Sequence, residues 1–143
     1  MEQLIRAALD RDQVGLAYQP IVDLANGRVV GTEALLRLRH TDGSPAGAAG
    51  RSVLRTAARQ AATWWRETGR LVPVWVNVSA LQVHDASFVD GVLGALDAAG
   101  LPAAGLAVEL TESVLLTTDR APLARLWELD RAGAPLALGG FGT

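Results

Sequence analysis

The chain has 143 residues, half of them apolar, which is enough to bury the core of one domain. Its formal charge is -2, with 13 arginines and no lysine, so we expect neither a nucleic-acid polymer nor a membrane as partner, and no lysine nucleophile. The chain contains no cysteine, which excludes disulfides and thiolate metal sites. Because residues 1–6 lack the apolar core of a signal peptide and no stretch reaches the length of a membrane span, we expect a cytoplasmic protein.

The predicted elements begin with a helix and an antiparallel hairpin. Residues 2–10 carry apolar side chains at helical spacing, which predicts a short amphipathic helix before the first strand. Two strand-like runs follow, over residues 16–24 and 29–38, and the Asn26-Gly27 pair between them is a hairpin turn signal. The first two strands should therefore be antiparallel.

The rest of the chain alternates helices with strands. The sequence predicts strands over residues 72–78, 106–110 and 135–138, and helices over residues 52–68, over residues 90–99, and from a cap at Thr118 or Asp119 to Gly133. This alternation predicts parallel strands whose C-terminal ends lie along one rim of the sheet. That rim is where barrels and doubly wound sheets place their functional sites.

Polar side chains interrupt three of the predicted strands. Glu33, Asn77 and Glu109 each lie within an apolar run, and the strand-helix spacing brings them to one rim. They offer only oxygen ligands, a set that suits Mg²⁺, Mn²⁺ or Ca²⁺ and not zinc. The alternative is a set of structural ion pairs, in which Arg37 or Arg39 would neutralise Glu33. The spacing alone leaves both interpretations open.

The histidines and tryptophans are expected to lie outside this site. Both histidines occur in turn-like contexts, which predicts surface loop residues: His40 and His84. All four tryptophans fall on predicted helices or strands, where apolar packing explains them: Trp64, Trp65, Trp75 and Trp127.

Five short motifs occur in the order in which one known family has them. They are Gln19-Pro20-Ile21, Glu33-Ala34-Leu35-Leu36-Arg37, Asn77-Val78-Ser79, Glu109-Leu110-Thr111-Glu112 and Phe141-Gly142-Thr143. Together they resemble the EAL domain, the cyclic-di-GMP phosphodiesterase family, whose fold is a modified TIM barrel with an antiparallel first strand. The resemblance covers residues 14–143 but only the first half of that domain. It implies an α/β fold, a partial TIM-like barrel of about five strands.

The resemblance also implies a division of the chain and roles for individual residues. Residues 1–143 would form one truncated EAL-like domain, with residues 1–13 as the lead-in helix. Glu33, Asn77 and Glu109 would bind the family's Mg²⁺ or Mn²⁺. Two further residues would contact the dinucleotide: Gln19, and Arg37 at a phosphate. In the family, two metal ions support hydrolysis of one phosphodiester bond of cyclic-di-GMP.

The sequence departs from the family at its last motif. Gly139 and Gly140 stand where the family has two adjacent aspartates, and glycine has no side chain with which to bind a metal. The resemblance also implies that Glu112 would anchor the loop that follows the strand over residues 135–138. The family's catalytic lysine has no counterpart in a chain without lysine. We therefore expect no catalytic residue and no hydrolysis, and these losses weaken the expectation of metal binding.

Three functions follow from this resemblance. The chain would act by binding cyclic-di-GMP or a protein, or it would be an active phosphodiesterase half completed by another chain, or it would be a truncated relic without function. A partial barrel also leaves an open sheet edge, which predicts pairing with a second protein chain or self-association.

Overall fold

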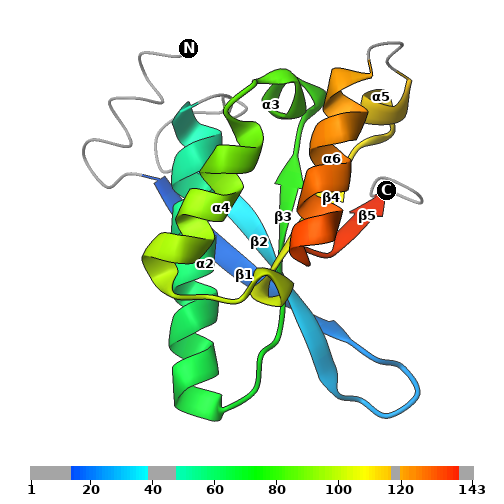
Figure 1. Cartoon of the computed structure of the whole chain (residues 1–143). Coiled ribbons are helices and arrows are strands. Elements are labelled where there is room, and N and C mark those ends of the chain that lie inside the picture. The colour runs from blue at the N-terminus through cyan, green and yellow to red at the C-terminus, as the bar shows by residue number, and fades with distance from the viewer. Residues whose placement is uncertain (1–13, 39–47, 117–119, 139–143) are drawn as a thin grey trace.

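The computed structural model describes residues 14–38, 48–116 and 120–138, and these form one curved sheet with helices on one face (Figure 1). The five strands follow one another in the sheet in chain order. They are β1 (Val14–Val22), β2 (Val29–Leu38), β3 (Val74–Val78), β4 (Leu106–Leu110) and β5 (Leu136–Leu138). β1 and β2 are antiparallel, and each later strand is parallel to the one before it. Since β1 and β5 form the two edges, the barrel is not closed, which confirms the predicted partial barrel with an antiparallel first strand.

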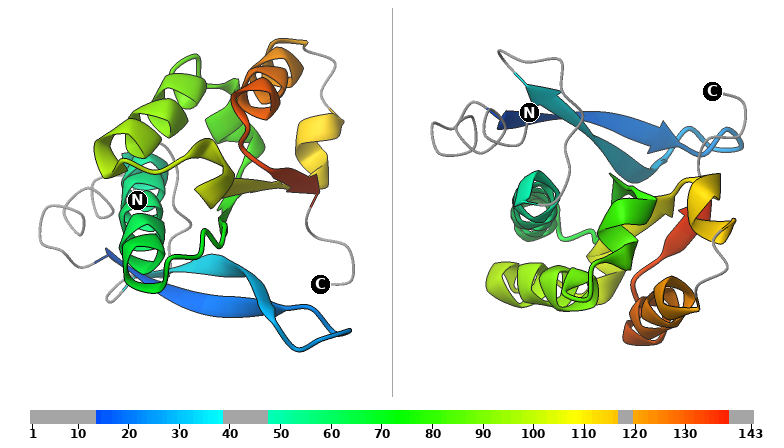
Figure 2. Two further views of the ribbon diagram at one scale, coloured as in Figure 1. Left: turned by 60° about the horizontal axis from the view of Figure 1, so that its bottom comes forward. Right: turned by 90° about the horizontal axis from the view of Figure 1, so that it is seen from above.

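The helices lie mainly in a second layer. They are α2 (Ala48–Thr68), α3 (Ala80–His84), α4 (Phe88–Ala99), α5 (Glu112–Leu115) and α6 (Ala121–Ala132), with a short 3₁₀ turn, η1 (Ala103–Gly105), before β4. The three long helices α2, α4 and α6 stand side by side against the same face of the sheet (Figure 2). In the described parts of the chain, no helix combines the length and apolarity that a membrane crossing needs.

The hairpin turn between β1 and β2 is held by its own polar side chains. The Asp23 carboxylate accepts a hydrogen bond from the backbone of Ala25 at 2.8 Å, and the Asn26 side chain accepts one from the backbone of Arg28 at 2.9 Å. Gly27 adopts a positive φ of 71°, which suits glycine. The turn was predicted at the right place. Because Asp23 already belongs to the turn, β1 ends at Val22, two residues before its predicted end.

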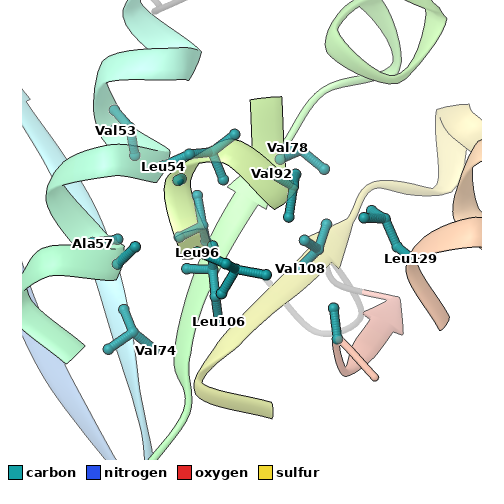
Figure 3. Close-up of a cluster of buried hydrophobic side chains, with 14 of the residues drawn as sticks. Val53, Leu54, Ala57, Val74, Val78, Val92, Leu96, Leu106, Val108 and Leu129 are labelled. Atoms are coloured by element: carbon teal, nitrogen blue, oxygen red, sulfur yellow. The ribbon is translucent and has the colours of Figure 1, made fainter. Parts of the chain in front are cut away.

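The hydrophobic core fills the space between the sheet and the helices (Figure 3). Alternate β3 side chains, from Val74 to Val78, are buried toward the helices, and Leu106 and Val108 of β4 join them. α2 presents four buried alanines to this layer, and such small side chains allow a helix to lie close to its neighbours: Ala57, Ala58, Ala61 and Ala62.

The sequence predicted the ends of the helices more accurately than their starts. α4 and α6 end at Gly100 and Gly133, both in the left-handed conformation, as predicted. α6 begins after Arg120 rather than at a cap on Thr118 or Asp119, and those two residues lie outside the described chain. The starts of α2 and α4 were predicted too late, by four and two residues. The helix predicted over residues 2–10 also lies outside the described residues.

Two predictions about single residues were wrong. His84 is the last residue of helix α3 and not part of a loop, although it is exposed; His40 lies outside the described residues. Trp127 has 64% of its surface exposed, so apolar packing does not account for it. The other three tryptophans are partly buried, as packing requires: Trp64, Trp65 and Trp75.

Candidate functional site

The polar residues singled out by the sequence lie on the face of the sheet opposite the helices. Asn77 is exposed between buried Val76 and Val78, and Glu109 is half-buried between two fully or nearly buried neighbours in β4. Because side chains alternate along a strand, Asn77 and Glu109 point away from the core. Their strands are positioned by that core on the opposite face.

The strand register brings these residues together. Asn77 is paired directly with Glu109 across β3 and β4. Glu33 is paired with Trp75, which is two residues before Asn77 and therefore on the same face. Gln19 of β1 is paired with Glu33. Four neighbouring strands thus deliver one row of polar side chains to the face that a closed barrel would enclose.

A hydrogen bond joins two members of this row. The Asn77 side-chain nitrogen donates to Glu33 Oε1 at 3.0 Å, although the two residues are 44 positions apart in the chain. The bond fixes the Asn77 amide so that its Oδ1 atom keeps its acceptor capacity. The alternative partners for Glu33, the side chains of Arg37 and Arg39, lie outside the described part of the structure.

The two carboxylates of the site repel one another. Partial burial raises the pKa of Glu109, and the negative charge of Glu33 raises it further. Two carboxylates and an amide oxygen on adjacent strands are a donor set of the kind that hard divalent cations prefer. A cation between them would offset both the cost of burying the Glu109 charge and its repulsion from Glu33.

These residues fit part of a divalent-metal site. Glu33, Asn77 and Glu109 can offer three oxygen donors, and an octahedral ion would take its remaining ligands from water or a phosphate. Among the described residues, no group of three or more His, Cys, Asp or Glu side chains could hold a metal. A metal held by the described residues would therefore need the Asn77 amide beside the two carboxylates.

The structure describes only some of the other predicted site residues. Gln19 is exposed on β1 beside Glu33. The backbone of Arg37 is paired with Gly15 near the end of β2, but its side chain lies outside the described structure. Glu112 is the exposed first residue of α5. Gly139 and Gly140, with the loop that Glu112 would anchor, also lie outside it.

Trp75 is a member of this face that the sequence did not indicate. A Cβ atom on Gly31 would come within 3.0 Å of Trp75 Nε1, so the indole lies against the bare backbone of β2 beside Glu33. A glycine inside a strand indicates such a close approach of a neighbouring group, and Gly31 is that glycine.

Ser79 lies in the same motif as Asn77 but has a structural role. It caps helix α3 together with Gln82.

Comparison with known proteins gives one consistent family. The sequence model of the EAL domain matches residues 2–143. An uncharacterized protein of Mycobacterium tuberculosis is 38% identical over 154 aligned residues, which cover 96% of this chain and 50% of that protein. The cyclic di-GMP phosphodiesterase NbdA of Pseudomonas aeruginosa is 37% identical, and the match covers 100% of this chain and 20% of NbdA. This chain thus spans half or less of the length of these relatives.

Solved structures agree with this result. The PaMucR phosphodiesterase in complex with c-di-GMP superposes with a TM-score of 0.85 at 33% identity, over 100% of this chain and 65% of that one. The EAL domain of Mycobacterium smegmatis DcpA superposes with a TM-score of 0.75 at 34% identity, over 90% of this chain and 54% of that one. Both the sequence and the fold therefore assign this chain to the EAL domain family.

Proposed function

We propose that this chain binds cyclic-di-GMP with the help of a divalent cation at the face formed by Glu33, Asn77 and Glu109, and that it does not hydrolyse the dinucleotide. The observation that carries the proposal is the hydrogen bond between Asn77 and Glu33, with Glu109 paired directly with Asn77. It supports one shared site built from β2, β3 and β4. The PaMucR structure, a complex with c-di-GMP, supports the choice of ligand.

Each residue would have a distinct part in binding. The carboxylates of Glu33 and Glu109 and the amide oxygen of Asn77 would hold Mg²⁺ or Mn²⁺, which would supply positive charge beside a phosphate of the dinucleotide. Gln19 stands beside Glu33 and can donate a hydrogen bond to the ligand. Arg37 has the planar guanidinium that suits a phosphate. Glu112 would support the loop beyond β5.

Hydrolysis is not expected because Gly139 and Gly140 cannot replace the family's two aspartates as metal ligands. Removing one part of a catalytic constellation commonly costs orders of magnitude in rate, and here two ligand positions are changed.

The expected result is that this chain, incubated with cyclic-di-GMP and Mg²⁺ or Mn²⁺, yields no more linear dinucleotide than a sample without protein. Chromatographic separation of the cyclic and linear dinucleotides measures this directly. An active EAL phosphodiesterase under the same conditions is the positive control. Formation of linear product that increases with the amount of this chain, and that persists after repeated purification, would contradict the absence of hydrolysis. It would not contradict the proposed binding of cyclic-di-GMP.

A further inference from the structure

A groove runs between helices α2 and α4, which stand side by side (Figure 2). Its volume is about 600 Å³, a size typical of sites for small molecules. The helix layer and the sheet separate it from the proposed cyclic-di-GMP site, and it lies away from β5. We call it the α2–α4 groove; its lining includes Ser52, Arg55 and Arg59 of α2 and Asp90, Gly94 and Ala98 of α4.

The α4 wall of this groove consists mainly of residues with little or no side chain, among them Gly91, Gly94, Ala95 and Ala98. Glycine in the interior of a helix makes the helix less stable than alanine does. The fold gives no reason for a glycine at Gly94, because a Cβ atom there would meet no other atom within 4 Å. The space beside Gly94 is therefore open to a ligand.

The α2 wall supplies positive charge. Arg55 and Arg59 are exposed and lie four positions apart, so their guanidinium groups are on the same side of the helix. Neither side chain forms an ion pair or a hydrogen bond with another residue of the described chain. Arg59 acts only at a distance on Tyr18, because burial raises the pKa of that hydroxyl and the Arg59 charge opposes the rise. Two unpaired guanidinium groups one turn apart can hold a phosphate by charge-assisted hydrogen bonds.

The other end of the groove offers a carboxylate. Ser52 is near the start of α2, and Asp90 is exposed in the first turn of α4. The two helices run in the same direction, because each follows one parallel strand and leads to the next. Ser52 is thus at the Asp90 end, and the seven positions from Ser52 to Arg59 span ~10 Å. Because an ionised carboxylate only accepts hydrogen bonds, Asp90 favours a ligand that donates them at this end.

We propose that the α2–α4 groove binds a nucleoside monophosphate, with its phosphate at Arg55 and Arg59 and its base at the Asp90 end. A nucleoside monophosphate has the charge and the length that the groove requires, and its flat base can lie against the small residues of α4. Guanine suits the Asp90 end better than adenine, because it presents two adjacent N–H donors to one carboxylate. This site is separate from the proposed cyclic-di-GMP site and needs no metal.

Calorimetric titration of guanosine monophosphate (GMP) in the presence of a chelator measures this binding without the metal of the other site. We expect saturable binding that becomes roughly tenfold weaker after Arg55→Gln or Arg59→Gln, because each change removes a charge-assisted hydrogen bond. The matched control is Arg66→Gln, an exposed arginine of α2 outside the groove, which should leave the affinity unchanged. Glu109→Gln, at the other site, should leave it unchanged too.

Gly94→Gln tests the groove without removing a ligand group. Its side chain would enter open space, and replacement of a helix glycine should raise the melting temperature. The variant should nevertheless lose most of its GMP binding, and a loss in a more stable protein is not caused by unfolding.

Asp90→Asn tests recognition of the base. The unaltered chain should bind GMP more tightly than adenosine monophosphate, and Asp90→Asn should reduce this preference because the amide is a weaker acceptor with no charge. Asp97→Asn is the control, since Asp97 is exposed on α4 outside the groove. Equal binding of the two nucleotides by the unaltered chain would contradict the role of Asp90.

Absence of saturable binding at millimolar GMP would overturn the proposal and leave the metal-dependent site unaffected. GMP binding that is insensitive to Arg55→Gln and Arg59→Gln, or that is lost in Glu109→Gln, would overturn it too, because the nucleotide would then lie elsewhere. If guanosine bound as tightly as GMP, the phosphate would not be recognised. If inorganic phosphate bound as tightly as GMP, the groove would be an anion site and not a nucleotide site.

Discussion

Replacing Glu109 by glutamine is expected to weaken metal-dependent binding of cyclic-di-GMP by at least ~10-fold, since even supporting residues of metal sites commonly contribute this much. The same variant should be more stable than the unaltered chain when both are free of metal at neutral pH. These opposite effects have one cause, the charge of the Glu109 carboxylate. Glutamine keeps the shape of the side chain and removes that charge.

The sign of the stability effect follows from the direction of the pKa shift. Burial and the charge of Glu33 raise the pKa of Glu109 in the folded protein. The folded chain therefore holds this proton more tightly than the unfolded chain does, and that stabilisation is fully present below the unfolded pKa. It is lost as the pH rises through the ordinary glutamate range to the raised pKa of Glu109. The Glu109→Gln variant should lack this loss.

Thermal unfolding in the presence of a chelator, from acid to neutral pH, measures the effect. The melting temperatures of Glu109→Gln and the unaltered chain should diverge as the pH rises, with the variant higher. Glu67→Gln is the matched control, because Glu67 is exposed near the end of α2. If Glu109→Gln binds metal and cyclic-di-GMP normally, Glu109 is not a ligand. If it shows no stability gain, burial and the charge of Glu33 do not raise the pKa of Glu109 as described.

Leu106→Ala is expected to lower the free energy of unfolding by ~2–5 kcal/mol, the range for buried leucine-to-alanine changes. Leu106 has 0% of its surface exposed at the start of β4, between the sheet and the helices (Figure 3). Its removal would leave a cavity that the surrounding β-branched and leucine side chains fill only in part. The change should weaken the sheet that positions Glu109 as well.

Denaturant unfolding followed by circular dichroism measures this loss. Leu24→Ala is the control, since Leu24 is fully exposed at 100% in the hairpin turn, and its replacement should change the free energy of unfolding by no more than about 0.5 kcal/mol. If both changes lowered the free energy of unfolding by the same amount, Leu106 would not belong to the main hydrophobic core.

The sequence predicted the long elements because their signals are local. β2 and β4 have the predicted bounds, since each is a mainly apolar run with turn-forming residues close to its start. Helices α3 and α5 were missed because five and four residues are too few to display a helical period. Ser79 and Gln82 nevertheless form a capping box that signals the start of α3.

The convergence of Glu33, Asn77 and Glu109 was predictable from strand alternation and the strand-helix rhythm. The hydrogen bond from Asn77 to Glu33 was not, because it depends on the offset between β2 and β3, which no local pattern sets. The exposure of Trp127 was missed for a related reason. Helical spacing identifies an apolar side chain, but burial depends on which elements lie beside that side of the helix.

A calorimetric titration of cyclic-di-GMP into the folded chain, with and without Mn²⁺ or Mg²⁺, tests the proposed binding site most directly. The account predicts saturable heat in the presence of the metal and its loss after chelation. Cyclic AMP serves as the control ligand and should give no comparable heat. Absence of heat at high micromolar cyclic-di-GMP with metal present, from a chain shown to be folded, would contradict the proposed site.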